Sequence, residues 1–497
     1  MLDPLILVIA PVICSLYWLL SIIYALYLHP LRHIPGPRPW IILPLLRHIA
    51  GVRGRLDTDI HRFHERYGPV VRFTDNEVSF ITTEAWSKIY GHGHRELPKV
   101  SSSAANPRDI VSSNEADHSR FRKALSPAFS AKGLQAQEPL INSYVDTLIS
   151  RLKGIADSQL PADMVKWYNL TTFDIIGDLA FGESFGGLES SQYHYWVATI
   201  FQFIKFIPFV RLRDAYPMFF KALSLVMPKK LLTARERQRA HTRITVQKRL
   251  DNASKYNRGD FMDSMLRNHG EKDGLSHEEL VANANILILA GSETTATLLS
   301  GITYWLLKSP DTLAKLTTEV RSTMKSEADI TASSVVAKLP YMQACIDEAF
   351  RMYPPVPTGL QRMTIEPTLI SGYELPAGVS NPECLTKVFV HSLAAYQSSS
   401  NFHAPKRYLP ERWLPEARTD PTSPFFSDNR EVLQPFSTGP RNCIGRNLAL
   451  VEMRIIVARL LWNFDLELCE ESRHWSDQKT FAVWEKSPLM CKLSLRT

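Results

Sequence analysis

Cysteine is scarce in this chain, and its scarcity narrows the kinds of protein to which the chain can belong. The 497 residues hold six cysteines, and no two of them are separated by only two residues. A disulfide framework or a zinc ribbon needs more cysteines at closer spacing. We therefore expect the chain to fold in a reducing compartment, where each cysteine acts alone.

Strong net charge, internal repeats and low-complexity tracts are absent as well. The net charge is only +7, and the 57 basic residues are dispersed along the chain. This mild basic excess suits an anionic membrane surface or an acidic protein partner, but it is too small to predict binding to nucleic acid. The 45% hydrophobic and 22% charged composition is typical of a globular protein.

Charge is completely missing from Leu5–Leu28, which reads LILVIAPVICSLYWLLSIIYALYL. As a helix this segment would be about 36 Å long, enough to cross a hydrocarbon core of about 30 Å. A cleaved signal peptide is the alternative, but no basic region precedes the run and no cleavage motif follows it. Asp3 precedes the span, whereas Arg32 and Arg38 follow it. Residues 1–29 are therefore predicted to be a membrane anchor, with the rest of the chain in the cytosol.

The remainder is organised as a proline-rich hinge and one long body. Four prolines in His29–Trp40 make residues 30–40 a stiff, extended connector. In residues 41–497, helical periodicity dominates and no alternation of strands and helices appears, so we expect a mainly α fold with small β-sheets. The expected strands are Val70–Phe73, Val78–Thr82 and Leu489–Leu495, and the expected helices are Leu134–Lys153, Thr171–Ala180, Ala234–Asn252, His277–Lys308, Pro310–Lys325, Tyr341–Met352 and Arg446–Trp462.

The segment Trp196–Pro228 is aromatic and apolar, with scattered lysines and arginines. Such a segment could be a pair of core helices or a flap that dips into the membrane beside an access channel. Because the anchor already places the body at a membrane, we favour the flap.

A glycine- and proline-rich loop, PFSTGPRNCIG, surrounds Cys443 near the end of the chain. A thiolate is a soft, electron-donating ligand, and one cysteine suffices to hold haem iron axially. The predicted helix from Arg446 begins just after the loop, so its positive end would stabilise a negative sulfur. Arg441 could reach a haem carboxylate from the same loop. A buried structural cysteine is the alternative reading.

An acid and a hydroxyl interrupt the apolar helix ILILAGSETTATLL. A polar pair in such a helix is costly unless it is solvated or used. The small Ala290 and Gly291 leave room for a small ligand beside the helix. Glu293 could carry protons inward, and Thr294 could orient a hydrogen bond. The alternative for Thr294 is a hydroxyl bonded back to a helix carbonyl.

The order Phe436-x-x-Gly439-x-Arg441-x-Cys443-x-Gly445 resembles the cysteine-ligand loop of the cytochrome P450 superfamily. Further motifs follow the family's order, from the helix element HSRFR through AGSETT and Glu-x-x-Arg to PERW. The resemblance implies the cytochrome P450 fold, a triangular haem-thiolate prism, with haem b as cofactor. It assigns Cys443 to the iron, Phe436, Gly445, His118, Arg122, Arg441 and Arg362 to haem binding, Glu293 and Thr294 to oxygen activation, and Glu348, Arg351 and Arg412 to a buried structural triad.

The same resemblance implies a monooxygenase that inserts one oxygen atom from dioxygen by hydroxylation or epoxidation. Electrons would come from NADPH through NADPH-cytochrome P450 reductase, with cytochrome b5 as a second candidate partner, at the endoplasmic reticulum membrane. The reductase is expected to dock on a basic face formed by Arg120, Arg122, Lys123 and Arg446. The chain is most similar to filamentous-fungal microsomal members, which implies a lipophilic secondary metabolite such as a terpenoid or polyketide as substrate.

One departure from the family's pattern lies at Ser380–Thr386, where seven extra residues precede KVFVHSLAAY. They are either a loop insertion or a translated intron remnant, and the second case would disturb a sheet next to the haem. Two alternative functions stay open, and the insertion bears on the second of them. One is a P450-fold isomerase or dehydratase, and the other is an inactive relative that binds haem or lipid.

Overall fold

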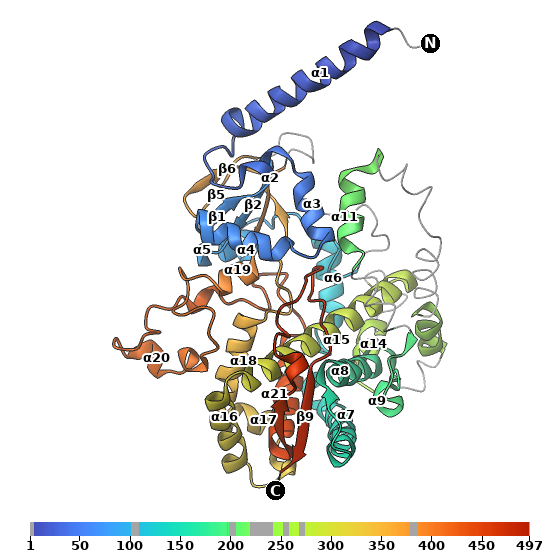
Figure 1. Cartoon of the computed structure of the whole chain (residues 1–497). Coiled ribbons are helices and arrows are strands. Elements are labelled where there is room, and N and C mark those ends of the chain that lie inside the picture. The colour runs from blue at the N-terminus through green and yellow to red at the C-terminus, as the bar shows by residue number, and fades with distance from the viewer. Residues whose placement is uncertain are drawn as a thin grey trace. The chain divides into compact units, whose positions relative to one another are not determined.

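The computed structural model describes residues 4–100, 109–195, 197, 205–218, 242–251, 258–267, 274–377 and 385–496 (Figure 1). It divides into two compact units, each assembled from three stretches of chain. Unit 1 comprises Met1–Val100, Thr358–Asn401 and Asn429–Arg441, and unit 2 comprises Ser101–Pro357, Phe402–Asp428 and Asn442–Thr497. Because the chain crosses between the units several times, no single linker in the sequence marks their boundary.

Unit 1 is built on a four-stranded sheet in the order β1-β2-β7-β4. β1 (Val70–Arg72) and β2 (Glu77–Phe80) form an antiparallel hairpin and lie close to the predicted strands Val70–Phe73 and Val78–Thr82. β7 (Lys387–Val390) runs parallel to β2, and β4 (Arg362–Met363) pairs with β7 in the antiparallel sense. A separate hairpin joins β5 (Thr368–Ile370) to β6 (Tyr373–Leu375).

The predicted anchor is helical, and it belongs to unit 1. α1 (Pro4–Ile23) continues into a π-helical turn, η1 (Tyr24–Leu28), and none of Pro11–Leu28 is buried in the protein. This helix is long and apolar enough to cross a membrane. The other helices of unit 1 are α2 (Arg38–Ile42), α3 (Leu45–Val52), α4 (Leu56–Tyr67), α5 (Thr83–Tyr90), α19 (Ser392–Tyr396) and the 3-10 turn η6 (Arg430–Val432).

Unit 2 is organised around α15 (His277–Leu307), which packs along α8 (Met164–Phe181) and also touches α18 (Pro340–Met352) and α21 (Arg446–Asn463) (Figure 1). α15 also has the length and apolarity of a membrane span, but it is mostly buried, as expected of a core helix. A three-stranded antiparallel sheet has the order β3-β9-β8. Its strands are β3 (Ala162–Asp163), β8 (Phe464–Leu468) and β9 (Met490–Leu495).

The remaining elements of unit 2 are mostly helices and short helical turns. They are α6 (Glu115–Leu125), α7 (Ala131–Asp157), α9 (Gly187–Ser190), α11 (Ile207–Ala215), α14 (Phe261–Leu266), α16 (Pro310–Thr323), η3 (Glu327–Asp329), α17 (Ala332–Lys338), η5 (Pro410–Trp413), α20 (Glu416–Thr419) and η7 (Glu470–Ser472).

Local capping explains where several predicted helices begin. α8 starts seven residues before the predicted Thr171 because the Asp163 side chain accepts a hydrogen bond from the Lys166 backbone N–H. α15 starts as predicted, at a capping box in which Ser276 and Glu279 bond to each other's backbone. Mainly helical architecture with small sheets is thus confirmed.

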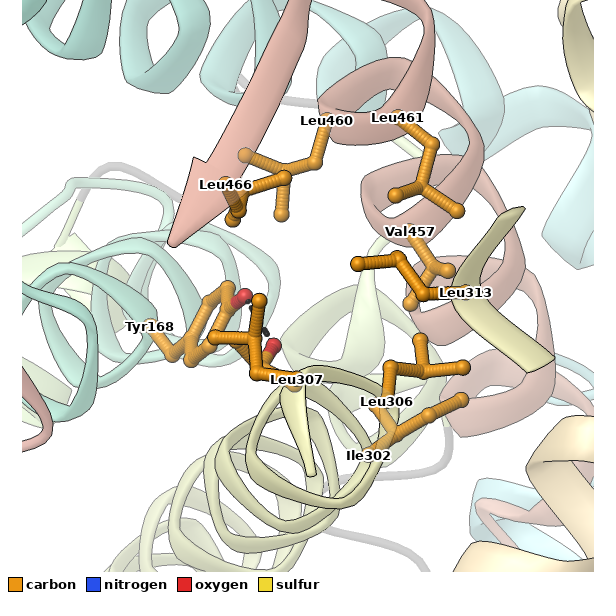
Figure 2. A pocket seen from close by; sticks show the side chains of 10 residues that line it. Tyr168, Ile302, Leu306, Leu307, Leu313, Val457, Leu460, Leu461 and Leu466 are labelled. Atoms are coloured by element: carbon orange, nitrogen blue, oxygen red, sulfur yellow. Dashed lines mark hydrogen bonds between the residues drawn. The ribbon is translucent and has the colours of Figure 1, made fainter. Parts of the chain in front are cut away.

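A small apolar cavity lies in the core of unit 2, lined by side chains from α8, α15, α16, α21 and β8 (Figure 2). Its two hydroxyls, those of Tyr168 and Thr303, bond to each other at 2.6 Å. The rest of the lining is aliphatic, and no predicted site residue takes part in it. The cavity is therefore a gap in core packing rather than a place for substrate.

Three predicted segments are only partly described. Of the predicted helix Ala234–Asn252, the structure describes residues 242–251, which are helical. Of Trp196–Pro228, the structure describes Val197 and residues 205–218, where α11 carries the half-exposed Phe209 and the exposed Met218 follows it. Of the extra residues Ser380–Thr386, the first five lie outside the described part of the chain. Thr386 is buried beside β7, and its carbonyl accepts a hydrogen bond from the Thr364 backbone N–H.

Candidate functional site

Cys443 lies in the loop immediately before α21. Its sulfur accepts hydrogen bonds from the backbone N–H groups of Gly445 and Arg446. Burial raises the pKa of the thiol, while these N–H groups and the positive charges of Arg122 and Arg446 lower it. The side chain is nevertheless exposed by surface area. The thiol is thus surrounded by protein atoms and yet accessible, which suits a side chain that binds iron.

Arg122, on α6, braces this loop by binding Asn442, the residue before Cys443. Its guanidinium donates to the Asn442 backbone carbonyl at 2.7 Å and to the Asn442 side-chain oxygen at 2.5 Å. His118 is buried one turn earlier on the same helix. Arg120, in contrast, is engaged by Glu279 at 2.5 Å and by Asp117 at 3.1 Å. The charge of Arg120 is therefore largely compensated by these two carboxylates. A residue that docks an acidic partner such as the reductase would be expected to keep its charge available.

The first half of the cysteine loop belongs to unit 1. Gly439 has φ of 75°, and a Cβ atom there would lie 1.7 Å from the Tyr90 carbonyl oxygen. Only glycine fits such a conformation at such close approach. Phe436 is half-buried in the same segment, and the turn tightens through a 2.9 Å bond from the Ser437 N–H to the Gln434 carbonyl.

Two of the predicted haem-binding arginines come together in unit 1. Arg362 is buried on β4, with its guanidinium 5.2 Å from the centre of the Tyr90 ring. Burial lowers the pKa of Arg362, and the charge of Arg441 lowers it further. Arg441 pairs with Glu96 at 2.7 Å. Two cations beside one carboxylate leave a local positive charge that suits a further carboxylate such as a haem propionate.

The middle of α15 is open on one side. Ala290 is exposed although most of the helix around it is buried. Thr294, one turn later, is half-buried, and its hydroxyl donates to the Ala290 carbonyl at 2.8 Å. The back-bond that the sequence left as an alternative is thus made. It commits the hydroxyl proton and leaves the oxygen free to accept a hydrogen bond from the open side.

Glu293, the neighbour of Thr294, is buried and points elsewhere. Its Oε1 lies 2.5 Å from the Nζ of Lys486, and that ammonium also donates to the Thr297 hydroxyl at 2.6 Å. Successive helix residues are rotated by about 100°, so the acid and the alcohol occupy different faces of α15. No hydrogen bond joins Glu293 to Thr294 within the described chain.

Glu348, Arg351 and Arg412 are fully buried and in contact. Arg351 pairs with both oxygens of Glu348 at 2.8 and 2.9 Å, and Arg412 approaches the same carboxylate at 3.1 Å. Burial opposes ionisation of Glu348, but the two arginines hold its pKa below the usual value. Trp413 donates to Glu348 as well, at 2.9 Å, so this carboxylate fixes the chain around η5 to α18.

Glu452 is a buried acid that sequence reasoning missed. It lies on α21, nine residues after Cys443, and forms a hydrogen bond with Thr295 of α15. Burial raises the pKa of Glu452 to about 8. The available signal was a single carboxyl group within the apolar run LALVEMRIIVARLL. Lys486 was missed too, because nothing in the sequence around it distinguishes it from a surface lysine.

These residues fit haem b. In unit 2 an accessible thiol receives two N–H donors and α15 is exposed at Ala290, and in unit 1 the paired arginines offer a positive site. When bound, haem supplies the chemistry that activates dioxygen. The protein would then supply the sulfur ligand, the charges that hold the carboxylates and the polar groups along α15.

Comparison with known proteins identifies the family. Residues 34–493 match the model of the Cytochrome P450 family. The chain is 57% identical over 485 residues to cytochrome P450 monooxygenase olcB of Penicillium canescens, with 97% of each chain covered. It is 54% identical over 476 residues to a trichothecene C-4 hydroxylase of Trichoderma arundinaceum, covering 95% of this chain and 94% of the relative. It is 43% identical over 493 residues to an averantin hydroxylase of Dothistroma septosporum, covering 97% and 90%. The predicted resemblance is therefore confirmed, and the chain belongs to the cytochrome P450 family of haem-dependent monooxygenases.

Proposed function

We propose that this monooxygenase hydroxylates a lipophilic secondary metabolite, such as a terpenoid or a polyketide, with Cys443 as the axial ligand of haem iron. The geometry of Cys443 carries the proposal, because its sulfur receives two backbone N–H groups and is accessible. Two relatives are named as hydroxylases, yet their names give different substrates. The relatives therefore support hydroxylation as the reaction, but they do not point to one particular substrate.

The remaining site roles belong to the same proposal. Arg362 and Arg441 hold haem propionates, with His118 and Arg122 binding haem from α6 and with Phe436 and Gly445 shaping the loop. Thr294 accepts a hydrogen bond on the open side of α15, and Glu293 relays protons. Glu348, Arg351 and Arg412 brace the structure, which their complete burial supports.

We also propose how the chain is organised in the cell. Residues 1–29 anchor it in the endoplasmic reticulum membrane, 30–40 act as a hinge, and 41–497 form the cytosolic haem domain. NADPH-cytochrome P450 reductase supplies electrons, and cytochrome b5 is a second candidate donor. The uncharged, unburied helix Pro11–Leu28 supports the anchor.

The test has three stages. First, the reduced protein with carbon monoxide should give the thiolate absorption band, and Cys443→Ala should abolish it. Second, reductase, NADPH and ¹⁸O₂ should yield a product that carries one labelled oxygen atom. Third, comparison of metabolites before and after gene deletion should identify the substrate that accumulates.

The stages separate the alternatives. A thiolate band with product formation that needs neither NADPH nor dioxygen would favour an isomerase or dehydratase. Absence of the band from the folded wild-type chain would favour an inactive relative and would contradict the proposal.

A further inference from the structure

The Glu293–Lys486 pair is unusual because both charged groups are buried. Their side chains are only 3% and 4% exposed, and Lys486 Nζ lies 2.5 Å from Glu293 Oε1. Removing two charges from water costs several kcal/mol, and an apolar pair of similar volume is often as stable. Stability alone therefore gives no reason for an ion pair at this place.

The segment that carries Lys486 is held on both sides. Before it, the Trp484 indole donates to the Pro354 carbonyl at 2.7 Å and stacks on Tyr353 with ring centres 4.5 Å apart. After it, the Ser487 carbonyl accepts a hydrogen bond from the Trp475 indole at 2.8 Å. These contacts restrict the backbone on both sides of Lys486. The ammonium is therefore held beside Glu293 of α15.

The two oxygens of Glu293 differ as a result. Oε1 receives Lys486, and the hydroxyl of Thr297 lies 3.4 Å from it on the next turn of α15. Oε2 is buried and receives no hydrogen bond from any residue that the structure describes. Because Oε1 already receives the ammonium, Oε2 is the oxygen that remains able to accept a further hydrogen bond.

The other titratable groups that face Glu293 do not replace Lys486. Tyr193 precedes the partly described flap, and Tyr353 follows α18. Burial, and then the negative charge of Glu293, raises the pKa of Tyr353. Burial is also the largest cause of the raised pKa of Tyr193, to which Asn169 donates a hydrogen bond at 3.3 Å. Both phenols therefore stay neutral near pH 7, and Lys486 supplies the positive charge.

We propose that Lys486 is a positioning residue for oxygen activation: it holds Glu293 in place on α15 through Oε1 and leaves Oε2 as the proton-accepting atom. After each transfer, Oε2 gives up the proton it accepted, so the pair returns to its starting charge. Lys486 touches neither substrate nor haem in this proposal and acts through Glu293. The proposal rests on the proton-relay role proposed above for Glu293.

Product formed per NADPH consumed, measured from pH 6.5 to 8.5, tests this role in the full-length haem protein. The wild type should show a constant ratio. In Lys486→Met the unpaired, buried Glu293 becomes neutral at the lower pH values. The ratio should fall at least fivefold at pH 6.5, with hydrogen peroxide replacing product, and should recover toward pH 8.5. Lys486→Arg keeps the positive charge and should restore a flat profile.

A matched control removes another lysine with the same contact distance. Lys248 pairs with Glu183 at 2.5 Å, but both side chains are exposed. Lys248→Met should match the wild type at every pH. A purely structural role for Lys486 would lower the ratio by the same factor at every pH, or leave it unchanged. Either result would overturn the proposal.

A measurement without turnover separates this proposal from the proposed function. The free energy of unfolding of Lys486→Met should decrease as pH rises, since the folded state disfavours a charged, unpaired Glu293. The double variant Lys486→Met/Glu293→Gln should lack this added dependence and should follow the pH profile of the wild type. If the two variants show these profiles but no oxygenation occurs, the role of Lys486 toward Glu293 is supported and the proposed function is contradicted. If the pH dependence is equal in the two variants, Lys486 does not control the ionisation of Glu293.

Discussion

Arg72 of β1 donates a hydrogen bond of 2.9 Å from Nη1 to the backbone carbonyl of Ala25 in η1. The same guanidinium donates to the carbonyls of Thr74 and Asp75 at 3.1 and 2.8 Å, and Arg72 is only 1% exposed. Burial lowers the pKa of Arg72 to about 10, so it remains charged near pH 7. Within unit 1, this side chain ties the end of the apolar N-terminal helix to the sheet.

Arg72→Met should therefore loosen this tie. Removing the guanidinium leaves carbonyls without donors, and we expect a loss of about 3–5 kcal/mol in the free energy of unfolding. Hydrogen exchange should accelerate in η1 and β1. Arg55→Met removes a largely exposed arginine that pairs with Asp59 at 3.5 Å, and it should change little. Unchanged exchange in η1 would show that Arg72 does not hold the anchor.

Glu348→Ala should be far more damaging than loss of a comparable surface carboxylate. It leaves Arg351 and Arg412 buried without their shared partner, which costs about 3–5 kcal/mol. Haem content per folded chain and urea unfolding measure the effect. Glu470→Ala is the matched control, since Glu470 and Arg473 have the same i, i+3 spacing on the surface. The control should cost less than about 1 kcal/mol. Equal losses in the two variants would contradict a bracing role for Glu348.

Gly439→Ala should abolish the carbon monoxide band of the reduced protein. The new methyl group would lie 1.7 Å from the Tyr90 carbonyl, at a residue with φ of 75°. Gly154→Ala provides the opposite case, because a methyl group added at Gly154, inside α7, would meet no heavy atom within 4 Å. That change should stabilise the chain by about 0.5–1 kcal/mol and keep the band. A normal spectrum in Gly439→Ala would disprove the steric argument.

Glu452 should make the wild type less stable as pH rises. Its folded pKa is raised to about 8, above the value of about 4.3 expected in the unfolded chain. Between these values the folded state keeps a proton that the unfolded state has lost. The free energy of unfolding should therefore fall by about 1.4 kcal/mol per pH unit from this group. Urea titrations of wild type and Glu452→Gln from pH 5 to 8 should differ by that slope. Parallel curves would refute it.

Lys123→Glu should slow electron delivery without loss of haem. Lys123 is exposed on α6, one residue after Arg122, which braces the cysteine loop. If the reductase docks on this basic face, charge reversal should lower the rate of haem reduction about tenfold at low salt, and the difference should shrink as salt rises. Arg66→Glu, a change on α4 of unit 1, should leave the rate unchanged. An unaltered rate in Lys123→Glu at low salt would exclude Lys123 from the docking surface.

The elements that could be predicted from the sequence are those specified by residues close together in the chain. The hairpin of β1 and β2, the start of α15 at its capping box and the start of α21 after Cys443 agree with the structure. α8 proved longer than predicted because its cap, Asp163, lies beyond the periodic segment. The two units escaped prediction because each collects three distant stretches of chain.

For the site, the sequence by itself determined which residue types stand in which order, including Cys443 within its loop and Glu293 beside Thr294. The order of residues is enough to predict the loop and the helices that carry them, because loop, cap and helix signals act over a few residues. Tertiary structure alone decided the partners. It paired Glu293 with Lys486 across 193 positions, Arg72 with Ala25 across 47 positions, and Glu452 with Thr295 on a different helix. Such pairings depend on burial, which brings distant groups into a low-dielectric interior where each charge needs a specific partner.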